Sequence, residues 1–308
     1  MGHKDWVSSV AFSPDGILLA TASLDGTVRL WNPATGEPVG DPLIGHQNGV
    51  WGVAFSPDGT LLATAGENEK VRLWNPITGQ PAGGAFIGHQ GGVWGVAFSP
   101  DGTLLATGGE DGTVRLWNPA TGRVAGDPLT GHQGRVLSVA FSPDGILLAT
   151  AGGDGAVRLW NPATGEPVGD PLIGHQDGVL SVAFSPDGTF LATAGQDEKV
   201  RLWNPITGQP AGGPLTGQPA GGAFIGHQGG VWGVAFSPDG TLLATGGEDG
   251  TVRLWDPATG RPVGGPLTGP QGRVLSVAFS PDGTLLAAAG GLFETVRLWL
   301  TPSCRSET

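Results

Sequence analysis

The chain repeats one sequence pattern seven times, and this repetition limits the folds open to it more than any other feature. Each copy contains FSPDG, then LLAT or a close variant, then VRLW, and six copies are preceded by Gly-His. Successive VRLW tryptophans are separated by 43, 43, 43, 43, 52 and 44 residues; they are Trp31, Trp74, Trp117, Trp160, Trp203, Trp255 and Trp299. A period in the forties indicates a solenoid, a propeller or another array rather than an ordinary globular domain.

A single repeat has the pattern of four short strands. Residues 50–55 are a dense apolar run, which suits a strand covered on both faces. Ser-Pro-Asp-Gly at 56–59 predicts a turn, and residues 61–65 and 71–74 then form the second and third strands. Residues 80–86 predict a weaker fourth strand, whose prolines restrict it to a sheet edge. A four-stranded antiparallel meander of this kind is the blade of a β-propeller.

These motifs resemble the WD-repeat β-propeller family, and within it the bacterial proteins whose repeats are nearly identical. The shared features are Gly-His, SPDG, an Asp turn, and a Trp followed by an acidic or related residue. That following residue is Asp only at Asp256; it is Asn in five repeats and Leu300 in the last, and Asn can still cap the turn. The resemblance implies an all-β, seven-bladed propeller with a seventh blade that is irregular or incomplete. The single domain covers 1–299, with repeats at about 2–44, 45–87, 88–130, 131–173, 174–225, 226–268 and 269–299.

The resemblance also implies a buried structural network in each repeat. In the family, the Gly-His histidine is linked by hydrogen bonds to the turn Asp, a second-strand hydroxyl and the Trp indole. The residues concerned here are His3, Thr21, Asp25, Trp31, His46, Thr64, Trp74, His89, Thr107, Asp111, Trp117, His132, Thr150, Asp154, Trp160, His175, Thr193, Asp197, Trp203, His227, Thr245, Asp249 and Trp255. The grouping imitates a nucleophilic triad, but six equivalent copies would mean six active sites, which favours a structural role.

Two repeats depart from this network. Asn68 replaces the acid in the second repeat. The seventh repeat has Pro270 for the histidine, Ala288 for the threonine, and residues 292–294 in place of the Asp-Gly turn. We therefore expect the seventh blade to be the most loosely held.

A binding surface is implied at one mouth of the channel. In the family, residues near the start of the innermost strand, with the residue before the turn Asp, line the upper mouth. The matching positions here are Trp6, Ser8, Trp51, Trp94, Arg135, Leu137, Leu180, Trp232, Arg273 and Leu275, with Glu67, Glu110 and Glu248 before the turn. Aromatic and Arg clusters are frequent anchors of binding hot spots, so we expect a peptide with an apolar anchor and a basic residue. The alternative, in which the tryptophans only plug the channel, stays open.

Composition excludes several other functions. The net charge of −12 argues against a nucleic-acid partner, because such binding rests on basic residues. No apolar run approaches a membrane-spanning length, and the first residues lack the pattern of a secretion signal, so we expect a cytoplasmic protein with no membrane partner. Cys304 is the only cysteine, and the sequence lacks a phosphate loop, HExxH and CxxC; we therefore expect no enzyme activity, cofactor or metal.

A second level of repetition groups the repeats in threes. EPVGDPLIGHQ occurs twice, after Gly36 and Gly165, and a longer shared segment begins at Glu69 and again at Glu198. The extra residues of the fifth repeat are a local copy of GQPAGG, which we expect to loop outward. Residues 300–308 are a candidate outer strand for the last blade; an edge left open would allow self-association.

The function favoured by these observations is a noncatalytic platform that binds a protein or peptide partner of unknown identity at the upper mouth. Two alternatives stay open: a sensor or regulatory propeller that is part of a larger multidomain protein, and a recently amplified repeat array without a specialised ligand. A propeller enzyme would need irregular catalytic residues on one face, and the near-identical repeats argue against it.

Overall fold

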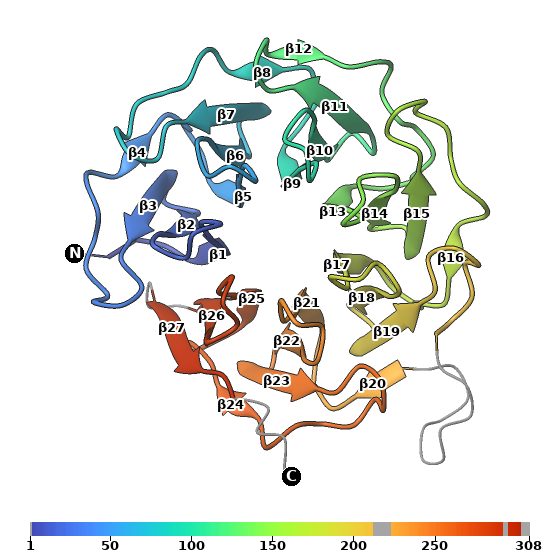
Figure 1. Cartoon of the computed structure of the whole chain (residues 1–308). Coiled ribbons are helices and arrows are strands. Elements are labelled where there is room, and N and C mark those ends of the chain that lie inside the picture. Colours follow the sequence, from blue (N-terminus) through green and yellow to red (C-terminus); the bar gives the residue numbers. More distant parts are fainter. Residues whose placement is uncertain (1, 212–222, 292–294, 303–308) are drawn as a thin grey trace.

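The strands of the chain form a closed ring of seven blades, seen along its axis in Figure 1. The computed structural model describes residues 2–211, 223–291 and 295–302, and these residues contain no helix. Six blades are four-stranded antiparallel sheets and the seventh has three strands. The prediction of an all-β, seven-bladed propeller with an incomplete last blade is confirmed.

Three strands of every blade follow the repeat closely, because each holds the apolar residues that the blade buries. The innermost strands are β1 (Val7–Phe12), β5 (Val50–Phe55), β9 (Val93–Phe98), β13 (Val136–Phe141), β17 (Val179–Phe184), β21 (Val231–Phe236) and β25 (Val274–Phe279). The second strands are β2 (Leu19–Ser23), β6 (Leu62–Gly66), β10 (Leu105–Gly109), β14 (Leu148–Gly152), β18 (Leu191–Gly195), β22 (Leu243–Gly247) and β26 (Leu285–Gly290). The third are β3 (Thr27–Trp31), β7 (Lys70–Trp74), β11 (Val114–Asn118), β15 (Ala156–Trp160), β19 (Lys199–Trp203), β23 (Thr251–Trp255) and β27 (Thr295–Leu300).

The fourth strands are much shorter than the sequence predicts. They are β4 (Leu43–Ile44), β8 (Phe86–Ile87), β12 (Arg123–Val124), β16 (Leu172–Ile173), β20 (Ala223–Ile225) and β24 (Leu267–Thr268). In the second blade, Pro81 forms an isolated bridge with Trp74, and regular pairing resumes only at Phe86. Proline has no N–H to donate, so the edge is paired only where other residues supply donors.

The SPDG turn is fixed by its own side chains. In the second blade, the Ser56 hydroxyl donates to Asp58 Oδ1 at 2.6 Å, and the Thr60 N–H donates to the same atom at 3.0 Å. Gly59 has a φ of 70°, a left-handed conformation that glycine adopts at little cost. The same carboxylate contacts recur in the other blades, so all seven hairpins turn alike.

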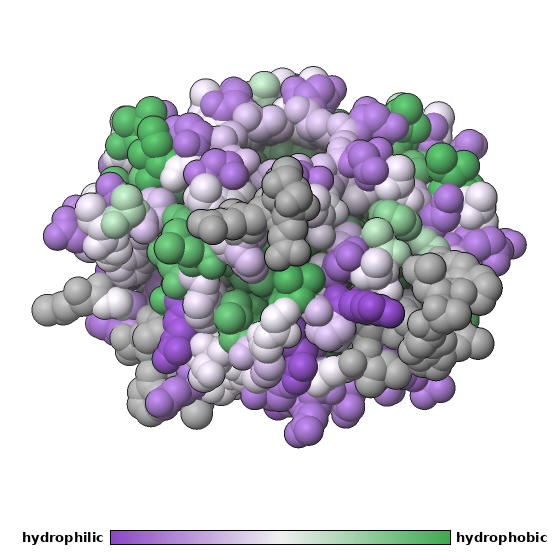
Figure 2. Space-filling model, turned by 60° about the horizontal axis from the view of Figure 1, so that its bottom comes forward, coloured by the Kyte–Doolittle hydropathy of each residue, from purple (hydrophilic) through white to green (hydrophobic). Residues whose placement is uncertain are grey.

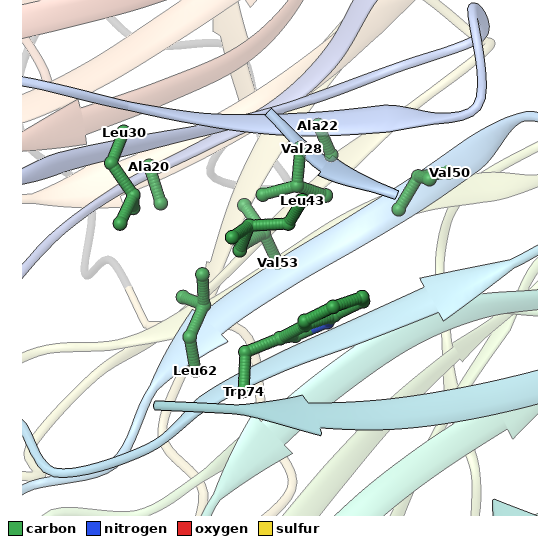
Figure 3. Close-up of a cluster of buried hydrophobic side chains, with 9 residues drawn as sticks. All are labelled: Ala20, Ala22, Val28, Leu30, Leu43, Val50, Val53, Leu62 and Trp74. Carbon is green, nitrogen blue, oxygen red and sulfur yellow. The ribbon is translucent and has the colours of Figure 1, made fainter. Parts of the chain in front are cut away.

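The hydrophobic core lies between blades rather than within them. Figure 3 shows one interface, where Val28, Leu30 and Leu43 of the first blade pack against Val53 and Trp74 of the second. Leu43 comes from the outer strand β4, so the fourth strand of the first blade helps to cover Trp74 of the second. Burying apolar area in this way is the main source of stability for the ring.

The ring closes by packing of the seventh blade on the first. Val7 and Val10 of β1, with Leu19, form a buried cluster with Ala287 and Ala289 of β26. The Val10 N–H also donates to Ser276 Oγ at 3.3 Å. The interface between first and last blades therefore resembles the others at its inner side.

Two predictions concern residues at the edge of the described structure. Leu300 is the last residue of β27, a third strand, and not part of an outer strand. The Thr301 N–H donates to the Thr284 carbonyl at 2.9 Å, which continues the pairing of β27 with β26 by one residue. Residues 303–308, like the repeated GQPAGG copy within 212–222, lie outside the described residues, so their predicted roles stay predictions.

The face shown in Figure 2 is mostly polar, with apolar residues in separate patches. Exposed apolar side chains include Ile44, Ile87 and Ile173 on outer strands, and Ile77 and Ile206 in the turns after the third strands. Among the described residues there is no helix with the length and hydropathy that a bilayer crossing requires.

Candidate functional site

The second residue of each innermost strand points to the channel axis, and together these residues form one small cavity. Its volume is about 90 Å³, and it is lined by Ser8, Trp51, Trp94, Leu137, Leu180, Trp232 and Leu275. Because every innermost strand begins at the same mouth, one position of the repeat supplies the whole ring. The structure brings together the seven residues that the sequence analysis selected at this position.

Two of the tryptophans stack on each other across a blade boundary. Trp51 of β5 and Trp94 of β9 have ring centroids 4.1 Å apart and planes inclined by 29°. Offset aromatic pairs of this kind are favourable by about 0.5–1.5 kcal/mol beyond their buried area. The pair therefore forms a rigid apolar wall on one side of the cavity.

Arg135 joins this wall through a cation–π contact and an ion pair. Its guanidinium carbon lies 5.6 Å from the Trp94 ring centroid, and its Nε lies 3.3 Å from Glu110 Oε1. Glu110 Oε2 accepts the Gly92 N–H at 3.3 Å, which fixes the carboxylate against the preceding loop. The arginine is thus held over the aromatic face from the neighbouring blade.

The same arrangement recurs three blades further around the ring. Arg273 lies 5.8 Å from the Trp232 ring centroid and forms an ion pair with Glu248, whose Oε2 accepts the Gly230 N–H at 3.3 Å. Side chains of Arg135 and Glu110 are 54% and 42% exposed, so this pair adds little to stability. The two Arg–Glu pairs position charge at the mouth and leave it accessible to a ligand.

Sequence reasoning selected these charged residues but did not pair them. Each Glu lies in one repeat and its Arg in the next, so the contact appears only when neighbouring blades are placed side by side. The sequence does contain a pattern that predicts the two pairs. In each pair the Glu and the Arg occupy the same two rim positions of consecutive repeats, the third and fourth or the sixth and seventh.

The channel tryptophans differ from the repeat tryptophans in their hydrogen bonding. The Nε1 atoms of Trp51, Trp94 and Trp232 are buried and have no acceptor among the described residues. By contrast, the Trp74 and Trp117 indoles donate to threonine hydroxyls at 3.0 and 2.8 Å. A buried donor without an acceptor costs about 1–3 kcal/mol.

The other rim residues selected from the sequence behave differently. The Ser8 hydroxyl donates to the carbonyls of Ala22 and Val50, so it is not free to bind a ligand. Trp6 is half-buried and does not line the cavity. The Glu67 side chain is exposed and makes no ion pair among the described residues. Glu67 is therefore the accessible carboxylate for a basic group.

The histidine network is complete within the third blade and shows why it cannot act as a triad. Asp111 can only accept, so His89 Nδ1 donates to it at 3.1 Å, and the Thr107 hydroxyl donates to His89 Nε2 at 2.8 Å. The Trp117 indole donates to the same Thr107 oxygen at 2.8 Å. His89 and Thr107 are buried, so no nucleophile in this network faces solvent.

Equivalent contacts occur in the other blades whose residues match. The histidine-to-threonine distances are 2.6 Å for His3, 2.7 Å for His46, and 2.8 Å for His132, His175 and His227. The partners of the histidine Nδ1 atoms are, in chain order, Asp25, Asn68, Asp154, Asp197 and Asp249. The indoles that donate to the same threonines belong to Trp31, Trp74, Trp160, Trp203 and Trp255.

The environment of the network favours neutral histidine and ionised aspartate. Burial lowers the pKa of His89, and this outweighs the opposing effect of the Asp111 charge. Burial alone would raise the pKa of Asp111, but hydrogen bonds from the Gln90 N–H and from Thr113 bring it below its ordinary value. The protonation states are therefore those that the hydrogen bonds require.

The second and seventh blades depart from the network as their sequences indicate. His46 Nδ1 lies 2.9 Å from Asn68 Oδ1, but Asn68 Nδ2 is buried and has no acceptor among the described residues. Ala288 is buried in β26 where the other blades have threonine. Residues 292–294 lie outside the described residues. No grouping of three or more His, Cys, Asp and Glu side chains in the described ranges is arranged to hold a metal.

Comparison with known proteins gives one family and several short similarities. The family model for the WD domain, G-beta repeat, matches seven segments: residues 1–32, 36–75, 82–118, 126–161, 165–204, 220–256 and 261–299.

Curated proteins match over less than one repeat. Eukaryotic translation initiation factor 3 subunit I of Phaeosphaeria nodorum is 64% identical over 31 residues, which is 10% of this chain and 9% of that protein. Notchless protein homolog of Arabidopsis thaliana is 56% identical over 36 residues, 12% of this chain and 8% of the relative. Ribosome biogenesis protein ERB1 of Chaetomium thermophilum is 61% identical over 33 residues, 11% of this chain and 4% of the relative. The matches therefore span a tenth or less of these relatives.

Proposed function

The chain belongs to the WD domain, G-beta repeat family, and we propose that it is a noncatalytic platform that binds a protein or peptide partner at the channel mouth. The observation that supports this most is the set of three buried indole donors without acceptors around the 90 Å³ cavity. Two Arg–Glu pairs stand beside them. Aromatic and Arg groups in a partly desolvated pocket are the usual centre of a binding hot spot.

The chemistry of the mouth indicates the kind of ligand. The cavity has room for a small apolar side chain, packed against the Trp51–Trp94 stack. The indole N–H groups would donate to carbonyl oxygens of the ligand backbone. The Glu67 carboxylate would bind a basic side chain. An extended peptide with an apolar anchor and a neighbouring Lys or Arg meets all three requirements.

A noncatalytic role agrees with the state of the histidines. In every blade that has one, the histidine is bonded on both ring nitrogens to residues of its own blade, so it has no nitrogen left for proton transfer to a substrate. The names of the relatives, a subunit of an initiation factor and ribosome biogenesis proteins, describe proteins of macromolecular assemblies. A cytoplasmic location stays a prediction from the sequence.

A peptide selection tests the proposal. Short peptides are selected from a displayed random library on the intact chain, and their affinities are compared for the native chain and the Trp51→Ala/Trp94→Ala variant. We expect the double variant to bind at least about tenfold more weakly, which corresponds to about 1.4 kcal/mol. Ile77→Ala/Ile206→Ala is the matched control, because these side chains are 87% and 88% exposed and lie in the turns after VRLW.

The alternative role as a channel plug gives a different result. If the tryptophans only fill the channel, the double variant will unfold at a lower temperature but bind every selected peptide as tightly as the native chain. That outcome would refute binding at the mouth.

A further inference from the structure

The seam between the seventh and first blades has an open groove on its outer side. Its volume is about 220 Å³, and its apolar lining comes from Val296 and Leu298 of β27 and from Leu19 and Trp31 of the first blade. The turn residue Gly36 also borders it. We call this region the seam groove. It lies at the edge of the ring, away from the channel mouth, and continues the buried cluster that closes the ring.

At four other seams the same place is filled by one apolar side chain from the outer segment of the preceding blade. A Cβ placed on Gly79 would lie 3.4 Å from Leu43 Cδ2, and one on Gly165 or Gly208 would lie 3.3 Å from a leucine Cδ2. At Gly122 the neighbour is Phe86, at 3.2 Å. At Gly36, the matching position of the first blade, no atom of the described residues lies within 4 Å. The seam groove therefore lacks, among the described residues, the apolar side chain that packs against the equivalent glycine at the four other seams. We call this position beside Gly36 the socket.

The repeat tryptophan at this seam is correspondingly less covered. Trp74, Trp117, Trp160, Trp203 and Trp255 are 2–3% exposed. Trp31 is only half-buried. Covering its ring would remove apolar surface from water, which favours binding.

The backbone at the groove has the hydrogen-bonding groups that a fourth strand would need. In the third blade, Val114 exchanges two hydrogen bonds with Leu129, at 3.0 and 2.8 Å. The Leu116 carbonyl accepts the Ala125 N–H at 2.7 Å. Val296 and Leu298 occupy the places of Val114 and Leu116 in VRLW, so their corresponding groups face the open edge. An unpaired edge of this kind accepts an extended peptide by β-strand addition.

We propose that the seam groove binds an extended segment of another polypeptide, which adds as the fourth strand of the seventh blade. The segment has the chemistry of the fourth strands of this chain: a Leu or Phe side chain for the Gly36 socket, preceded by Pro, whose ring fixes φ. This site is separate from the channel mouth and does not depend on the function proposed for it.

Two other occupants are outcomes of the test below. Residues 303–308 lie outside the described residues, and a deletion variant tests them as the occupant. In a second copy of the chain, the described fourth strands already pair within their own blades. A separate segment of matching chemistry is therefore the occupant that the structure favours.

The test uses a peptide taken from the chain itself. The amidated, fluorescein-labelled peptide GEPVGDPL, the sequence of residues 36–43, is titrated with the full chain and followed by fluorescence anisotropy. We expect saturable binding that falls at least tenfold when the peptide's leucine is replaced by aspartate. Val296→Pro, which removes an edge N–H, and Leu298→Asp, which changes only the lining, should each weaken binding by a similar factor.

Matched controls separate the groove from the rest of the molecule. Leu300→Asp lies on the same strand, is 82% exposed, and should leave the affinity unchanged. Trp51→Ala/Trp94→Ala should also leave it unchanged, because those residues line the mouth. Thermal unfolding identifies any variant that fails to fold, and the aspartate peptide tests the socket on the native chain in every case.

Several results would overturn the proposal. They are the absence of saturable binding, equal binding of the two peptides, and binding that appears only after residues 303–308 are deleted, which would make the tail the occupant. A dimeric mass in solution that Val296→Pro converts to a monomeric mass would instead assign the groove to a second copy.

Discussion

The buried histidine of the third blade, His89, is held in its neutral form by its neighbours. A carboxylate on Nδ1 requires a proton there, and a threonine hydroxyl that also accepts an indole N–H donates its own proton to Nε2. Adding a second proton would break the Nε2 contact inside a buried site. Single residues therefore make the stability of the whole ring sensitive to acid.

We expect stability to fall as the pH drops below neutrality. Burial holds the pKa of His46, His89, His132 and His227 below the ordinary value of 6.5. As the pH falls through 6.5, the unfolded chain takes up protons before the folded chain does, so stability that is present above pH 6.5 is lost progressively below it. The lowered pKa values of Asp111, Asp154 and Asp249 add a second loss below their ordinary 3.8.

Calorimetry at a series of pH values measures this directly. The unfolding temperature should be nearly constant between pH 8 and pH 7 and should decrease between pH 6.5 and pH 5. An unchanged or higher unfolding temperature at pH 5 would contradict neutral, buried histidines.

The second blade offers a test of the acidic partner. Asn68→Asp would remove a buried amide nitrogen that lacks an acceptor. The new carboxylate would also accept the Gln47 N–H, as the Asp111 carboxylate accepts the Gln90 N–H in the third blade. We expect the free energy of unfolding to rise by about 1 kcal/mol, and Asp111→Asn to lower it by about the same amount. Urea unfolding of both variants checks the pair. Stabilisation by Asp111→Asn would contradict the role given to the carboxylate.

At the scale of single elements, the hairpin between second and third strands shows a local conflict. Four blades have glycine at this turn, with φ values of 75–81°, a left-handed conformation that glycine adopts without strain; the residues are Gly26, Gly112, Gly155 and Gly250. The second and fifth blades place Glu69 and Glu198 at this position, with φ values of 64° and 65°. A residue with a Cβ is strained there by about 1–2 kcal/mol.

Replacing either glutamate by glycine should therefore stabilise the chain. Part of the relieved strain is offset by the greater freedom of glycine in the unfolded chain, so we expect a net gain of about 0.5–1 kcal/mol for Glu69→Gly or Glu198→Gly. Glu67→Gly, two residues before Glu69 and outside the left-handed position, is the control. A loss of unfolding free energy in Glu69→Gly would contradict the strain.

The strands also show how much of the fold could be predicted from the sequence alone. In the second blade, the three inner strands begin and end within about one residue of their predicted bounds. Apolar runs that are bounded by Asp-Gly turns allow few other registers. The fourth strand is shorter than predicted because Pro81 has no N–H to donate and the glycines after it weaken a strand. The Arg135–Glu110 contact was missed because it joins two repeats, and spacing within one repeat contains no information about it.

At the scale of the whole molecule, the seam between the seventh and first blades has the smallest buried cluster found among the described residues. Within those residues its cluster has five buried members, whereas the clusters at the other six interfaces have seven to nine. The fourth strand that would enlarge it is absent from the described residues of the last blade. We therefore expect local unfolding of the ring to begin at the interface between the seventh and first blades.

Hydrogen exchange should identify that place. We expect the amides of β26 and β1 to exchange faster than those of β6 and β5, which have the same sequence pattern but a complete interface. Mass spectrometry of proteolytic fragments gives the comparison. Equal protection of the two regions would mean that the seam is as stable as the others.

The most direct measurement of binding at the channel mouth is an NMR titration of the tryptophan indoles. The chain is labelled with ¹⁵N at the indole nitrogen, a selected peptide is added, and signals are assigned with single Trp→Phe variants. Binding at the mouth predicts that the Trp51, Trp94 and Trp232 signals shift as their N–H groups gain acceptors, while Trp74 and Trp117, already bonded to threonines, stay in place. Shifts confined to the repeat tryptophans, with the three channel signals unmoved by a bound peptide, would contradict it.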